Sequence, residues 1–145
     1  MLDVYTSCYQ LTGQPFRLSP DYRFSFSHRT YDEAKAYLKY ATFEGEGFVV
    51  ITGAPGTGKT TLIGALLAEL DQSRVSVASL ANEQLDQREL IHRVNDAFGL
   101  PADNGVAPLP KLMRFLNQNQ IDGGRAILIV DEAQSLTPKA LEELR

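Results

Sequence analysis

A glycine-rich stretch in the first half of the chain has residue types and spacing that could bind phosphate. It reads Gly53-Ala54-Pro55-Gly56-Thr57-Gly58-Lys59-Thr60. The spacing matches the P-loop pattern, with an apolar run before it and a helical pattern after it, as such a loop requires. Its glycines let successive backbone N–H groups face a polyphosphate, and the N-terminus of the following helix adds partial positive charge.

Individual roles follow from this pattern. Lys59 is predicted to reach the β- and γ-phosphates of a nucleotide, and the Thr60 hydroxyl to take a site on Mg²⁺. We expect nucleotide contacts along the whole loop, from Gly53, Ala54, Pro55, Gly56, Thr57, Gly58, Lys59, Thr60 and Thr61. The alternative is a chance glycine-rich turn, which the combination of strand, lysine, threonine and amphipathic helix makes the weaker interpretation.

An acidic pair, Asp131-Glu132, follows the most apolar stretch of the chain, residues 126–130. Because Mg²⁺ prefers oxygen ligands and keeps several waters, Asp131 is predicted to hold the metal mainly through those waters. Glu132 is the candidate to orient or deprotonate an attacking water. The alternative is a polar strand end that caps a turn. Gln134 could contact nucleotide or a water near Glu132, or lie on the surface at the start of a helix.

Composition bounds the remaining possibilities. The chain has 145 residues and a formal net charge of −4, which suits one domain or part of one and gives no global attraction to nucleic acid. The single cysteine, Cys8, indicates a reducing compartment and a buried thiol. No signal peptide or transmembrane segment is predicted. We therefore expect a cytoplasmic chain, with contact to the inner face of the membrane only through partners or regions that follow.

The elements that must position these residues can be predicted in chain order. Residues 1–29 are rich in aromatics and irregular, and are expected to pack on the core, part of them near an adenine pocket. A capping box at Thr30 and Glu33 starts a helix that runs to about Phe43. Residues 48–52 form a strand buried in a parallel sheet, and a helix follows the loop.

A second set of elements follows. Residues 74–80 form a strand, and Asp86 with Glu89 forms a capping box for the next helix. A fourth helix covers about 109–121, residues 126–130 form a buried strand, and Thr137 with Pro138 starts a fifth helix. Strands and helices alternate throughout, which predicts an α/β fold with a parallel sheet covered on both faces. In such a sheet all strands end at one edge, so the loop and Asp131-Glu132 are expected to share a ligand.

Three stretches together give the chain a family resemblance: the loop, the N-terminal Pro15-Phe16-Arg17-Leu18-Ser19-Pro20, and Asp131-Glu132-Ala133-Gln134-Ser135-Leu136. The chain resembles the AAA-type ATPases of the general secretion pathway protein A group, whose relatives include the ATPase associated with exosortase loci and transposition-helper ATPases. The resemblance covers nearly the whole chain. Many NTPases share the loop, so the other two stretches carry more of the identification.

The resemblance implies site roles and a fold. Lys59 and Thr60 would be the Walker A pair, Asp131 the Walker B metal residue and Glu132 the catalytic glutamate. The fold would be a three-layer P-loop NTPase of the additional-strand class, incomplete at its C-terminus, with residues 30–145 as the first part of the ATPase domain. A further strand with its sensor residue, an arginine finger and a helical lid would follow Arg145. We therefore expect a fragment that is unstable or aggregates when expressed alone.

The leading functional hypothesis is binding of ATP with Mg²⁺ and hydrolysis that drives conformational change in a secretion or export assembly. In the full-length protein the expected partners are further copies of the chain and a protein of that assembly. The alternative is an ATP-dependent DNA-binding switch of the transposition-helper type, although the negative charge gives DNA binding no support. A small-molecule kinase is less favoured because Glu132 is present, and a GTPase because no Asn-Lys-x-Asp signature occurs.

Overall fold

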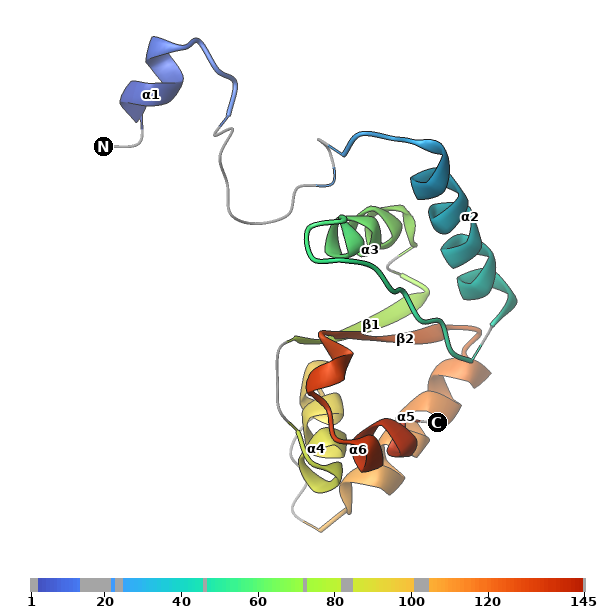
Figure 1. The fold of residues 1–145 in the computed structure, drawn as a ribbon. Coiled ribbons are helices and arrows are strands. Elements are labelled where there is room, and N and C mark those ends of the chain that lie inside the picture. Colours follow the sequence, from blue (N-terminus) through green and yellow to red (C-terminus); the bar gives the residue numbers. More distant parts are fainter. Residues whose placement is uncertain are drawn as a thin grey trace. The chain divides into compact units, whose positions relative to one another are not determined.

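The computed structural model describes residues 3–13, 22, 25–45, 47–71, 73–81, 85–100 and 105–144. Two units divide the chain, Met1–Glu69 and Leu70–Arg145, and Figure 1 shows the elements of each. The first contains the glycine-rich loop and the second contains the acidic pair.

Among its described residues the first unit contains the helices α1 (Asp3–Cys8), α2 (Arg29–Glu44) and α3 (Lys59–Glu69). Leu38 of α2 packs against Leu62 and Leu66 of α3 to form a small core. The apolar spacing that predicts α2 is confirmed, since Leu38 and Ala41 are buried and Tyr31 and Ala34 are half-buried. Gly45 ends α2 in the left-handed conformation, with φ of 77°.

The start of α2 differs from the prediction. His28, not Thr30, is the N-cap, and its Nδ1 accepts a hydrogen bond from Tyr31 N at 3.4 Å. Glu33 pairs instead with Arg29, at 3.0 Å between Nε and Oε1. The predicted capping box at Thr30 is therefore wrong, because the helix begins one residue before Thr30 and leaves it no cap to provide.

Residues 48–52 form no strand in the described part of the chain. Their burial still alternates, because Val49 and Ile51 pack against the core of the first unit whereas Phe48 and Val50 are 58% and 77% exposed. A strand exists only where a neighbour supplies its ladder of hydrogen bonds, and the described residues of this unit contain no second strand. The predicted buried strand is wrong here, and one side of the stretch reaches the core.

The N-terminal segment also departs from its sequence-based description. It contains helix α1, where an irregular segment is predicted, and Cys8 is exposed, so the predicted buried thiol is wrong. Tyr9 and Phe26 are 64% and 85% exposed. The Cδ1 atom of Tyr22 lies 3.7 Å from the point where a Cβ on Gly64 would stand. Residues 14–21 and 23–24 lie outside the described residues, and the packing and adenine-site roles of residues 1–29 stay predictions.

The second unit has a two-stranded parallel sheet, β1 (Val75–Ala81) with β2 (Arg125–Asp131). The register runs from Val75 opposite Arg125 to Ala81 opposite Asp131. In the sequence, α4 (Gln87–Ala97) and α5 (Pro108–Ile121) come between β1 and β2, and η2 (Ala133–Ser135) and α6 (Pro138–Glu143) follow β2. In Figure 1 these helices lie on one side of the two strands.

A second core joins these elements. Its buried members are all apolar: Leu80, Leu85, Leu90, Ile91, Val94, Leu112, Leu136 and Ala140. Leu128 and Val130 of β2 pack against it, while Ile127 and Ile129 lie one residue out of phase and so face the other side of the sheet. The predicted strand at residues 126–130 is confirmed as part of β2, but the predicted burial is wrong, because Ala126 to Asp131 are only half-buried in this two-stranded sheet.

The helix starts of this unit follow the sequence closely. The capping box is confirmed, since Asp86 Oδ1 accepts from Arg88 N and Glu89 N, and Glu89 Oε2 accepts from Asp86 N. Thr137 Oγ1 accepts from Ala140 N, with Pro138 in the first turn of α6. No helix among the described residues is long and apolar enough to span a membrane.

Candidate functional site

The glycine-rich loop has the backbone that its sequence predicts. Gly56 and Gly58 have φ of 79° and 86°, the left-handed region that an L side chain rarely adopts. At Gly53 the constraint is close approach, because a Cβ would lie 2.9 Å from Thr57 Oγ1. Gly56 and Gly58 are thus favoured by their positive φ, and a side chain at residue 53 would require the Thr57 hydroxyl to move.

Hydrogen bonds within the loop close it on itself. Ala54 O accepts from Thr57 N at 3.3 Å and from Thr57 Oγ1 at 2.9 Å. Lys59 Nζ donates to Gly53 O at 2.9 Å and to Ala54 O at 3.1 Å. The ammonium group is therefore folded over the loop, where its three donors could exchange weak carbonyl acceptors for phosphate oxygens.

The start of α3 completes this half of the site. Leu62 N donates to Gly58 O at 2.8 Å, so the helix begins directly from the last glycine. Lys59, Thr60 and Thr61 occupy its first turn, where the helix dipole and the backbone N–H groups favour an anion. A glycine backbone that leaves room, a lysine over the loop and a helix N-terminus together fit a polyphosphate.

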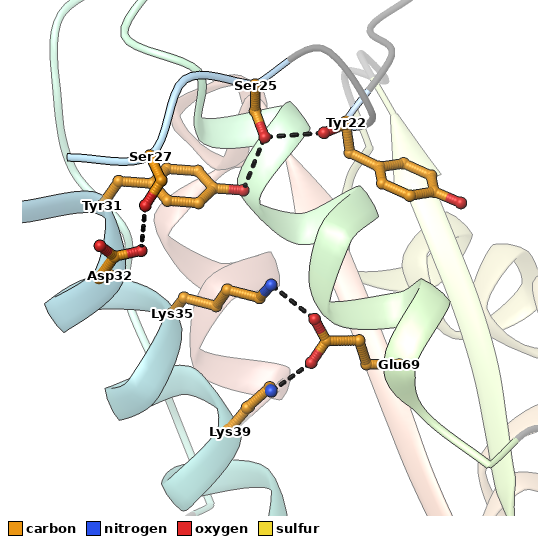
Figure 2. A network of polar contacts seen from close by, with 8 residues as sticks. All are labelled: Tyr22, Ser25, Ser27, Tyr31, Asp32, Lys35, Lys39 and Glu69. Carbon is orange, nitrogen blue, oxygen red and sulfur yellow. Dashed lines mark hydrogen bonds and ion pairs between the residues drawn. The ribbon is translucent and has the colours of Figure 1, made fainter.

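An ion-pair network holds the other end of α3 to α2, as Figure 2 shows. Lys35 Nζ lies 2.5 Å from Glu69 Oε1, and Lys39 pairs with the other carboxylate oxygen of Glu69. The hydrogen bonds from Lys35 and then Lys39 lower the pKa of the Glu69 carboxyl, and the bond to Glu69 raises the pKa of Lys35. The helix that carries Lys59 and Thr60 is thus fixed at its C-terminal end.

The acidic pair lies at the C-terminal end of β2, as predicted. Asp131 is the last residue of the strand and is half-buried, and its Oδ1 accepts from Glu132 N at 3.0 Å. Glu132 is exposed and has φ of 56° and ψ of 41°, a left-handed conformation unusual for a residue with a side chain. Such a conformation costs about 1–3 kcal/mol and persists only where surrounding contacts impose it.

The contacts that hold Glu132 in this conformation come from η2, a short helix not predicted from the sequence. Glu132 O accepts from Ser135 N and from Ser135 Oγ, both at 2.8 Å. Gln134 Nε2 donates to Glu132 Oε2. Gln134 is exposed, as one of its two predicted alternatives has it, whereas its direct bond to Glu132 and the role of Ser135 are not among the predictions. A serine three residues after an acidic strand end is the signal that could have indicated it, because a Ser hydroxyl bonds readily to nearby backbone.

The metal-binding roles of Thr60 and Asp131 stay predictions. Among the described residues no group of three or more His, Cys, Asp and Glu side chains could hold a metal ion by itself. Mg²⁺ bound with a nucleotide takes ligands from phosphates and water and needs only one or two protein oxygens. Because the loop lies in the first unit and the acidic pair in the second, their joint action on one ligand also stays a prediction.

Comparison with known proteins found a curated relative and a matching domain family. The chain is 39% identical to general secretion pathway protein A of Aeromonas hydrophila, in an alignment that covers 98% of this chain and 26% of that protein. The chain thus spans about a quarter of the length of the curated relative that it matches. No solved structure gives a significant match. The sequence profile of the AAA domain family matches residues 41–145, which contain both the loop and the acidic pair. The chain therefore belongs to this AAA domain family.

Proposed function

We propose that the chain binds ATP with Mg²⁺ through residues 53–61 and takes part in its hydrolysis through Asp131 and Glu132. The observation that carries the proposal is the loop itself, with Gly56 and Gly58 in left-handed conformations and Lys59 Nζ bonded to Gly53 O and Ala54 O. These groups suit a polyphosphate whatever the base, and the choice of ATP rests on the family and on the missing guanine signature.

Each side chain has a stated part in the proposed reaction. Lys59 and the N–H groups of the loop hold the phosphates and stabilise their negative charge. Thr60 and Asp131 hold Mg²⁺, which neutralises charge on the phosphates when it is bound. Glu132 accepts a hydrogen bond or a proton from the water that attacks. Because Glu132 is exposed at the strand end, its carboxylate is accessible to such a water.

Binding by the loop can be tested separately from hydrolysis. Lys59→Ala should weaken the binding of a fluorescent ATP analogue with Mg²⁺ by about tenfold or more, a loss of about 1.4 kcal/mol per factor of ten. Lys139→Ala is the matched control, because Lys139 is an exposed lysine on α6, in the other unit. Equal affinity of Lys59→Ala and the unmutated chain would contradict nucleotide binding by this loop.

The finer fold and the biological role are part of the same proposal. We propose a three-layer P-loop domain of the additional-strand class, acting as a homo-oligomer that couples its nucleotide state to a protein partner of a secretion or export system. The name of the A. hydrophila relative supports the secretion role. A transposition-helper switch is the second candidate, and salt-dependent DNA affinity that ATP stimulates would favour it. Release of a phosphorylated product in place of free phosphate would favour a kinase.

A further inference from the structure

The segment after β2 is fixed at both ends. At its start, Glu132 takes a left-handed backbone conformation held by two hydrogen bonds from Ser135 to Glu132 O. At its end, Leu136 is only 7% exposed and belongs to the core of the second unit, and Thr137 caps α6. Gln134 stands between these anchors, so its backbone position relative to Glu132 is set by the fold of the turn.

The side chain of Gln134 uses that position to reach the Glu132 carboxylate. Its Nε2 donates a hydrogen bond to Oε2 of Glu132. Among the described residues, Gln134 is the side chain that bonds to this carboxylate. Both residues are exposed. An exposed glutamate that lacked such a contact would sample several rotamers in water, and its carboxylate would point in several directions.

We propose that Gln134 is a positioning residue that holds the Glu132 carboxylate in one orientation for the attacking water. The inference rests on the proposed hydrolytic function. The Gln134 amide bonds to Oε2 and leaves Oε1 to accept from water. The Glu132 rotamer is then already fixed before the water binds, so no rotamer entropy is lost at that step. Gln134 itself does not touch the reacting atoms. It acts through Glu132, and Ser135 fixes the backbone from which both side chains project.

The experiment removes the donor while keeping the size of the side chain. Gln134→Met has an unbranched side chain of similar length with no N–H group, and Gln134→Glu replaces the donor by a second carboxylate. The matched control is Gln118→Met, because Gln118 Nε2 makes the same kind of exposed bond, to Asp122 Oδ1 at 3.0 Å on α5. All variants are measured for kcat, KM and Tm in the full-length protein.

Positioning predicts a specific pattern. In Gln134→Met, kcat should fall about tenfold, a fraction of the roughly 10²–10⁴-fold that a positioned acid or base supplies, and in Gln134→Glu it should fall further. KM and Tm should remain at wild-type values, as should all three quantities in Gln118→Met. An unchanged or increased kcat in Gln134→Met, or a fall in kcat that Gln118→Met matches, would overturn the positioning role.

A second readout needs no nucleotide and no turnover. In the ¹⁵N-labelled full-length protein the side-chain amide resonances of Gln134 should shift in Glu132→Ala, while those of Gln118 stay in place. Unshifted Gln134 resonances would overturn the contact on which the inference depends. Absence of hydrolysis by the wild type would overturn the proposed function and the inference with it, whereas normal hydrolysis that Gln134→Met leaves unchanged would overturn the inference alone.

Discussion

The glycine-rich loop and the acidic strand end reach unusual backbone conformations in opposite ways. In the loop, Gly56 and Gly58 have positive φ at almost no steric cost, because they lack a Cβ. At the strand end Glu132 has φ of 56° despite its side chain, and contacts from Ser135 and Asp131 hold it there. The loop geometry is therefore a property of its own residues, whereas the geometry at Glu132 depends on the turn around it.

The largest expected effect separates the two regions by function. Glu132→Gln keeps the shape of the side chain but removes the carboxylate, so hydrolysis in the full-length protein should fall by roughly 10²–10⁴-fold. Nucleotide affinity should stay close to the wild-type value, because the proposed phosphate contacts belong to the loop. Turnover and equilibrium binding of the ATP analogue measure the two quantities. Turnover equal to that of the wild type would contradict the role proposed for Glu132.

A smaller effect tests the claim that glycine itself allows the loop geometry. Gly58→Ala places a Cβ at a φ of 86° and should destabilise the loop by about 1–2 kcal/mol, with a matching loss of nucleotide affinity. Gly64→Ala is the matched control in α3, where the new Cβ would meet Tyr22 Cδ1 at an ordinary 3.7 Å. That change should stabilise the helix by about 0.5–1 kcal/mol. Urea unfolding measures the free energy of unfolding of both variants. A change of the same sign in Gly58→Ala and Gly64→Ala would contradict the claim that the positive φ at residue 58 requires glycine.

The same contrast explains what the sequence could predict. Three predicted features depend only on neighbouring residues, and the structure confirms each. They are the glycine backbone before Lys59 and Thr60, the capping box of Asp86 with Glu89, and the start of α6 at Pro138. The strand at residues 48–52 depends on a partner far along the chain, which local apolar character does not supply. The N-cap at His28 in place of Thr30 shows that two nearby polar residues can compete for one helix start.

The acidic end shows a different limit, because the contacts there are local but run against the preference of the residue type. The position of Asp131 and Glu132 at the end of a strand follows from the apolar run before them. The left-handed conformation of Glu132 does not, because its residue type disfavours positive φ and the stabilising contacts come from Ser135. The apolar run thus predicts which residues lie at the strand end, whereas local hydrogen bonds within the turn, from Ser135 to Glu132 O and from Gln134 to the Glu132 carboxylate, decide how Glu132 is held.

The smallest expected effect concerns the ion pairs that fix α3 behind the loop. The hydrogen bonds from Lys35 and Lys39 hold the pKa of Glu69 below its ordinary 4.5, so the folded state binds this proton less readily than the unfolded state does. The resulting stability is present above pH 4.5 and is lost as the pH falls through the lowered pKa of the folded state. Lys35 has the opposite sign, since its pKa is raised above 10.5 and its contribution is lost only as the pH rises through that higher value.

Glu69→Gln should therefore unfold at slightly lower urea than the wild type at neutral pH, and the difference should shrink on acidification. The effect should be small because the Glu69 carboxylate is exposed and water screens its two ion pairs. Glu142→Gln, on the exposed face of α6, is the control and should give no such pH-dependent difference. A constant gap between Glu69→Gln and the wild type across the acidic range would show that Glu69 supports α3 by packing and not by charge. In that case α3, like the turn at Glu132, would depend on contacts from neighbouring residues, whereas the loop geometry depends on its own glycines.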